Sequence, residues 1–131
     1  MGAEMNRYDL VFIGHVTIDE IEAKEGSAQG VPGGAPYFGA FAACWSEKRI
    51  AVVTRMAEED AYMLEPLKAA GIDVYLQPAP STTHMRVVHP TGNVDERLMF
   101  QTQNAGFFVS ADIPPIDSGL IHLGALTDRE F

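Results

Sequence analysis

Apolar runs alternate with polar segments along most of the chain, and their spacing predicts the secondary structure. The run Tyr8–Gly14 is rich in β-forming residues and ends at a glycine, as is typical of a strand buried on both faces. Ile50–Thr54 and Ile72–Leu76 predict two more strands, and helices are expected from Pro36 to about Lys48 and from Glu58 to Ala70. This β-α-β-α-β order favours an α/β fold with a parallel sheet covered by helices.

The two predicted helices carry signals of their own. Pro36 suits a first helical turn, and four side chains of the first helix are spaced to form one buried face. These are Tyr37, Phe41, Cys44 and Trp45. Pro66 predicts a break or kink in the second helix, because proline lacks the N–H that a helix interior requires.

The second half of the chain has a different pattern. Thr83–His89 and Glu96–Thr102 predict an antiparallel hairpin, because the turn-forming residues 90–93 separate them. The polar segment 19–31 is expected to be a loop or an edge strand, and Gly119–Leu123 to be another short buried strand. Several apolar hairpin residues fit either an apolar flap surface or ordinary packing. They are Met85, Val87, Met99 and Phe100.

Composition narrows the function. The chain of 131 residues supports one domain or part of a larger one. Nine basic against eighteen acidic residues give a net charge of −9, which argues against binding to nucleic acid or to an anionic membrane. The single cysteine, Cys44, excludes an intrachain disulfide and cysteine-rich metal sites. No apolar stretch is long enough to span a bilayer, and no signal peptide is evident, so a cytoplasmic location is expected.

Both ends of the chain carry expectations. Residues 1–7 are expected to be a leader outside the fold, which then spans 8–131. Thr127–Glu130 matches the Ser/Thr-x-x-Glu capping box that starts helices, yet the sequence stops one residue later. We therefore expect the 131 residues to be the first part of a longer domain. The alternative is a chance match at a frayed terminus.

Asp19 and the pair Gly33-Gly34 are the candidate ligand-binding residues. Asp19 follows the first strand, and ligands of parallel sheets bind beyond the carboxyl ends of the strands. A carboxylate there can accept hydrogen bonds from the hydroxyls of a polyol, although a solvated loop aspartate would look the same. Gly33-Gly34 precedes a helix and can expose backbone N–H groups to a ligand or simply form a tight loop.

Other chemistries are disfavoured. The glycines lack the G-x-G-x-x-G spacing, and no Walker lysine follows them. The four histidines are scattered, so no metal site is expected, and Cys44 is expected to be a core residue. No Ser-His-Asp or Cys-His arrangement follows from the spacing.

In order and spacing, five segments together resemble the ribokinase-like (PfkB) carbohydrate kinases. The segments are DLVFIGHVTIDEI, VPGGAPYFGAFAACW, IAVVTRMAEEDAYMLEPLKAAGIDV, THMRVVHPTGNVDERLMF and SADIPPIDSGLIHLGALTDREF. The resemblance implies part of a three-layer α/β sandwich with a small β-sheet lid, whose strands fall within about 19–32 and 72–102. It also implies transfer of a phosphoryl group from Mg-ATP to a sugar or nucleoside hydroxyl.

The resemblance also implies residue roles. The aspartate at the Asp19 position binds sugar hydroxyls, and Gly33-Gly34 contacts the substrate and hinges the lid. The family usually has an asparagine where this chain has Phe38, which implies a less polar pocket floor, and 55–60 lacks the usual glycine turn. The family's C-terminal half, with the nucleotide pocket, anion hole and catalytic base, is absent from this sequence, so no catalytic residue is expected here.

We therefore expect the substrate-binding part of a kinase, inactive by itself, that binds a sugar, nucleoside or polyol. The expected pocket residues are Thr17, Asp19, Gly33, Gly34, Phe38 and, as an alternative to a surface ion pair, Arg97. Two other hypotheses stay open. One is a non-catalytic binding or regulatory domain of the same fold that dimerises through the exposed lid edge. The other is a flavodoxin-like nucleotide binder.

Overall fold

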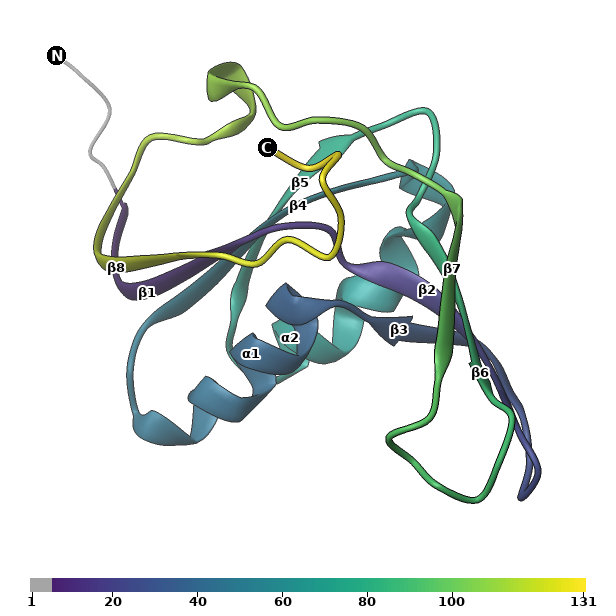
Figure 1. Cartoon of the computed structure of the whole chain (residues 1–131). Helices are drawn as coiled ribbons and strands as arrows, with labels where there is room; N and C mark the ends of the chain where they lie inside the picture. The colour runs from purple at the N-terminus through teal and green to yellow at the C-terminus, as the bar shows by residue number, and fades with distance from the viewer. Residues whose placement is uncertain (1–5) are drawn as a thin grey trace, which may run out of the picture.

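The computed structural model describes residues 6–131 and contains two four-stranded sheets, one of which carries the helices (Figure 1). Of the expected leader, residues 1–5 lie outside the described residues. Residues 6 and 7 are already part of the first strand, β1 (Asn6–Ile13), so a leader extending to residue 7 was wrong. They pair with the start of β8 (Ile116–Leu123), because strand pairing extends the ladder beyond the apolar run.

Both sheets have four strands, and we call the one whose strands contain more residues the larger sheet. It is parallel throughout, in the strand order β5-β4-β1-β8. Its other strands are β4 (Ile50–Met56) and β5 (Asp73–Pro78). Helices α1 (Ala35–Ala43) and α2 (Glu65–Ala69) cover one face, where Phe12 and Val52 point. On the other face, Val11 and Val53 pack against the segment 108–116. The strands β1 and β4 are buried on both sides, as their continuous apolar runs predict.

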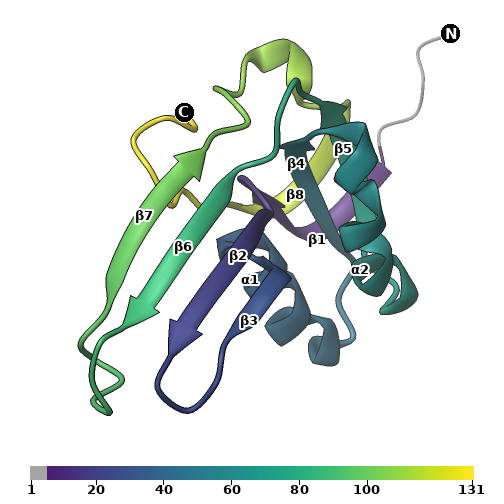
Figure 2. The same cartoon turned by 90° about the vertical axis from the view of Figure 1, so that its right-hand side faces the viewer.

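The smaller sheet has the order β3-β2-β6-β7, and Figure 2 shows its four strands side by side. The strands are β2 (Thr17–Ala23), β3 (Ala28–Gly33), β6 (His84–His89) and β7 (Leu98–Gln103). Strands β6 and β7 form the predicted antiparallel hairpin. Strand β5 falls within the range 72–102 that was expected to hold lid strands, but it pairs with β4 in the larger sheet.

The first helix is shorter than predicted, and the second is divided into two parts. The first ends at Ala43 and continues as the 3₁₀ turn η1 (Cys44–Ser46), which rotates Trp45 out of the buried face and leaves it 86% exposed. The second divides into the 3₁₀ helix η2 (Glu58–Leu64) and α2, with Pro66 in the first turn of α2. The predicted break at Pro66 is therefore confirmed, for the physical reason expected.

The last strand is longer and more exposed than expected. Gly119–Leu123 was predicted to be a buried strand, yet Leu120 is 63% and Leu123 59% exposed within β8. The strand occupies the edge of the larger sheet, and no other described element covers these side chains. The apolar pattern correctly indicated a strand, but burial depends on neighbours that a pattern cannot show.

The capping-box signal at Thr127–Glu130 leads to a turn within the described residues. Glu130 folds back, and its carboxylate Oε2 accepts the backbone N–H groups of Leu126 and Thr127. This is the carboxylate contact of a capping box, so the local signal describes the hydrogen bonding correctly. The buried position of Glu130 could not be read from the motif.

Candidate functional site

The carboxylate of Asp19 is held at one oxygen and closely packed at the other. The hydroxyl of Thr17 donates a hydrogen bond to Oδ1 at 2.6 Å. On the neighbouring strand Gly33 pairs with Thr17, and a Cβ atom at Gly33 would lie 2.1 Å from Asp19 Oδ2. The absence of a side chain at Gly33 therefore makes the space that this carboxylate occupies.

The environment of Asp19 disfavours the ionised form of its carboxyl group. Burial raises the pKa of Asp19, and the hydrogen bond from Thr17 lowers it in part. The charge of Glu20 adds to the rise, whereas nearby His84 opposes it. Among residues 6–131, Thr17 is the side chain that donates to this carboxylate, which leaves Oδ2 available to a further donor. A hydroxyl group could supply that donor.

Asp19 lies in the wall of a cavity of about 320 Å³ between the smaller sheet and the start of α1. The cavity is lined by Asp19, Gly34, Ala35, Phe38, Met85, Val87, Arg97, Met99 and Leu126. Four of the six expected pocket residues are thus among the lining residues. Thr17 and Gly33 lie behind the wall and hold the carboxylate, so they do not line the cavity.

The strand register explains how these side chains meet. Asp19 pairs with Met85 across β2 and β6, and Val87 pairs with Met99 across β6 and β7. Residues two apart on a strand share a face, so these positions all point to one side of the smaller sheet. Phe100 lies on the opposite face, where the guanidinium of Arg86 approaches its ring. Three of the four apolar hairpin residues therefore belong to the cavity.

Gly34 turns the chain from β3 into α1 in a conformation that favours glycine. Its φ is 98°, and a Cβ atom there would lie 2.4 Å from the carbonyl oxygen of His15. Its own carbonyl accepts the backbone N–H of Phe38, which starts the helix and places the Phe38 ring at the cavity. The diglycine therefore packs one residue against a carboxylate and the other against the backbone.

Arg97 lies just before β7 and reaches the cavity rim. The surface ion pair that was its alternative explanation is not formed: within residues 6–131, the carboxylates that bind arginine are bound to Arg7, Arg49, Arg55 and Arg86. The cavity thus has one carboxylate and one guanidinium among mainly apolar side chains. Such a lining can orient a small polar molecule and pack against its carbon skeleton.

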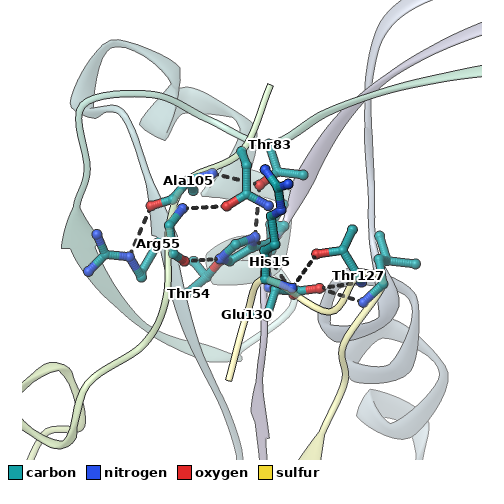
Figure 3. Close-up of polar contacts among 12 residues, drawn as sticks. His15, Thr54, Arg55, Thr83, Ala105, Thr127 and Glu130 are labelled. Carbon is teal, nitrogen blue, oxygen red and sulfur yellow. Dashed lines mark hydrogen bonds and ion pairs between the residues drawn. The ribbon is translucent and has the colours of Figure 1, made fainter. Parts of the chain in front are cut away.

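A buried hydrogen-bond network beside the cavity was not predicted (Figure 3). The imidazole of His15 bonds through Nε2 to the carbonyl of Gly106 and through Nδ1 to the hydroxyl of Thr83, both at 2.8 Å. The backbone N–H of His15 donates to Glu130 Oε1. His15, Thr83 and Glu130 are all fully buried. The capping box was the one local signal that pointed to any of them.

Within residues 6–131, no three histidine, cysteine, aspartate or glutamate side chains gather closely enough to hold a metal ion. None of the helices described there has the length and apolar character required to cross a membrane.

Solved structures place this architecture among kinases. The chain is similar to a pyrophosphate-dependent kinase in the ribokinase family, determined as a sulfate complex, with a TM-score of 0.84 and 25% identity over 93% of this chain. The chain has a ribokinase-like fold. The same match spans 43% of the kinase chain, so this ribokinase-like chain corresponds to less than half of that protein.

Two more structures support the ribokinase-like fold. A pyrophosphate-dependent kinase of the ribokinase family, complexed with a pyrophosphate analog and myo-inositol, matches with a TM-score of 0.77 and 25% identity, over 89% of this chain and 40% of that one. Fructokinase from Vibrio cholerae O395, bound to fructose, ADP and calcium, matches with a TM-score of 0.65 and 22% identity, over 89% of this chain and 40% of that one. No protein-family model and no curated protein matches the sequence.

Proposed function

We propose that this chain forms the acceptor-binding part of a kinase that phosphorylates a hydroxyl of a sugar, nucleoside or polyol. The observation that carries the proposal is the carboxylate of Asp19, a residue that lines the cavity and whose Oδ1 is held by the hydroxyl of Thr17. An acceptor hydroxyl that donates to Asp19 would offset the cost of burying a carboxylate. The polyol and sugar ligands named for the similar kinases agree with this chemistry.

The apolar walls favour an acceptor with one carbon-rich face. Met85, Val87 and Met99 would cover the acceptor from the smaller sheet, and Phe38 would form the opposite floor. Phe38 cannot accept or donate a conventional hydrogen bond, so that side of the acceptor would present C–H groups. Arg97 would then orient oxygen atoms at the rim.

The phosphoryl donor is not bound by residues of this chain in the proposal. Mg-ATP is the donor expected from the resemblance, whereas the similar kinases of the first two matches are described as pyrophosphate-dependent. Residues 6–131 present no cluster of metal-binding side chains, and the sequence has no Walker-type loop. The resemblance implies that the donor site and the catalytic base belong to the family's C-terminal half, so we assign neither to this chain and expect binding of the acceptor without turnover.

Isothermal titration of the chain with myo-inositol, fructose, ribose and adenosine tests the proposal. We expect one of these acceptors to bind and Asp19→Asn to weaken its binding about tenfold or more, because the carboxylate is the stronger acceptor of hydroxyl hydrogen bonds. Asp128→Asn is the matched control, since Asp128 is exposed and lies outside the cavity. No binding in the panel, or equal binding by Asp19→Asn, would contradict the proposal.

A second candidate is a non-catalytic domain that dimerises through the smaller sheet. It is favoured by the free edge of β7, where Leu98 and Phe100 are both exposed. Sedimentation velocity distinguishes the two. A dimer that dissociates in Leu98→Lys, together with no acceptor binding, would favour this candidate over the kinase part.

A further inference from the structure

His15 lies where the chain passes between the two sheets. The connections β1–β2, β5–β6 and β7–η3 all cross at this point, and η3 spans Ser110–Asp112. From the first connection, the imidazole of His15 bonds to Thr83 in the second and to Gly106 in the third. Thr83 Oγ1 also accepts the backbone N–H of Ala105 at 2.9 Å. One buried side chain therefore joins all three connections (Figure 3).

The hydrogen-bond partners of His15 determine which ring nitrogen carries the hydrogen. The carbonyl of Gly106 can only accept, so Nε2 must carry a hydrogen. Thr83 Oγ1 accepts from Ala105 and can donate its own hydrogen to Nδ1, so a neutral imidazole satisfies every group. A proton on Nδ1 would require the Thr83 hydroxyl to accept instead of donate, and the hydroxyl hydrogen would then lose its partner.

The surroundings of His15 shift the pKa of its imidazole in opposite directions. Burial lowers the pKa of His15, while the carboxylate of Glu130, 3.7 Å from Nδ1, and the bond to Gly106 raise it. The positive charge of Arg55 lowers it further. On the remaining side, the ring of Phe108 lies 5.5 Å away and carries no charge. The net lowering of the pKa agrees with the neutral form, in which every hydrogen-bonding group of this cluster has a partner.

Other hydrogen bonds reinforce the crossing. Ser81 Oγ donates to the carbonyl of Asn104 and joins the second connection to the third, and Glu130 accepts the backbone N–H groups of His15 and Phe108. Thr54 accepts the backbone N–H of Val16, and Arg55 donates to the carbonyl of Ala105, but each joins one connection to β4. Because the larger sheet and the smaller sheet meet through these connections, their relative orientation depends on what fixes the connections to one another. The bonded pair His15 and Thr83 joins all three connections.

We propose that His15 is a positioning residue that holds the smaller sheet over the cavity, so that acceptor affinity depends on an imidazole outside the cavity. This inference rests on the proposed function for its effect on the acceptor. Its structural part does not rest on that function, because it concerns only how the two sheets are held together. Asp19 and Met85 enter the cavity from the smaller sheet and Arg97 from the turn before β7, whereas Gly34 and Phe38 enter it from the loop and helix packed on the larger sheet.

Hydrogen–deuterium exchange of the full chain tests the structural part without any ligand. In Thr83→Val the shared hydroxyl is lost with little change of shape, and Thr83→Ser restores it. We expect Thr83→Val and His15→Gln to speed amide exchange in β6 and β7 about tenfold, with less than about threefold change in β1 and β4. Thr83→Ser should resemble the wild type. Equal acceleration in both sheets, or none in β6 and β7, would overturn the proposal.

The pH dependence provides a readout that a merely structural role would not change. As the pH falls from about 7 towards 5, protonation of His15 should reduce the protection of β6 and β7 in the wild type, after correction for intrinsic exchange. His15→Gln should lack this loss, and His84→Gln, which alters a histidine on β6 itself, should retain it. A loss that persists in His15→Gln would assign it to another group and contradict the proposal.

Titration with myo-inositol separates the two levels of the inference. We expect Thr83→Val to weaken acceptor binding about fivefold or more and Thr83→Ser to restore it. Faster exchange in β6 and β7 with unchanged affinity would refute the effect on the acceptor while the proposed function stands. If the wild type binds no acceptor, the proposed function fails, and the exchange data alone decide whether His15 fixes the smaller sheet.

Discussion

Replacing Gly33 by alanine should displace the Asp19 carboxylate while leaving the fold intact. The added Cβ atom would lie 2.1 Å from Asp19 Oδ2 and 2.6 Å from the carboxyl carbon, whereas ordinary contacts begin at about 3.4 Å. The backbone of Gly33 is outside the left-handed region, so alanine adds no strain of its own. The strain falls on the Asp19 side chain, which has to move by about 1 Å.

That movement has a calculable consequence. The hydrogen bond from Thr17 to Asp19 is 2.6 Å long, and a shift of about 1 Å takes it beyond hydrogen-bonding distance. An acceptor hydroxyl that relied on the same carboxylate would lose a charge-assisted bond of about 1.5–3 kcal/mol. The acceptor Kd should therefore rise about 10- to 100-fold. Alanine also reduces the entropy of the unfolded chain, so the free energy of unfolding should stay within about 1 kcal/mol of the wild type.

Isothermal titration with the acceptor and urea denaturation measure the two quantities. Gly92→Ala is the matched control, since Gly92 has open space around it and a φ outside the left-handed region. It should change neither affinity nor stability by more than experimental error. An unchanged Kd in Gly33→Ala would refute the argument that this glycine makes room for a ligand-binding carboxylate. A large loss of stability would show instead that Gly33 is needed for the fold.

Three further predictions concern stability measured by urea denaturation. Burial raises the pKa of Asp19 above 3.8 in the folded state, so the protonated side chain stabilises the fold fully below pH 3.8, and this stabilisation is lost as the pH rises through the folded-state pKa. Over that pH range the wild type should lose stability relative to Asp19→Asn. A stability difference that does not vary with pH would contradict burial as the cause. Gly34→Ala combines a φ of 98° with a backbone clash and should cost at least about 2 kcal/mol, whereas Gly71→Ala, at φ 83° in open space, should show only the strain of about 1–2 kcal/mol. Glu130→Gln turns a buried acceptor of backbone N–H groups partly into a donor and should cost about 1–3 kcal/mol, against less than about 0.5 kcal/mol for exposed Glu59→Gln; equal costs in the last pair would refute the bonding role of that carboxylate.

The order of strands and helices could be predicted because it depends on local signals. The run Tyr8–Gly14 indicated a buried central strand, the turn residues 90–93 indicated the hairpin, and Pro66 indicated the helix break. Lengths and exposures were less predictable. Trp45 has helical spacing relative to the buried face, yet the helix becomes a 3₁₀ turn before that residue.

The candidate site was likewise predictable only in part. Asp19 and Gly34 could be named because they follow a strand and precede a helix, and these are positions where parallel α/β sheets bind ligands. The holding role of Thr17 and the packing of Gly33 required the register between β2 and β3. The same sequence distance would have given different neighbours in a ladder shifted by one residue.

The sequence by itself determined the alternation of elements and the hairpin, because these depend on interactions between residues close in the chain. Only the tertiary structure decided that β5 joins the larger sheet, that Gly33 packs against the Asp19 carboxylate and that Leu126 lines the cavity. It also decided that His15 joins three chain segments far apart in sequence. Such contacts are set by strand pairing and packing over long sequence separations, which no local pattern encodes.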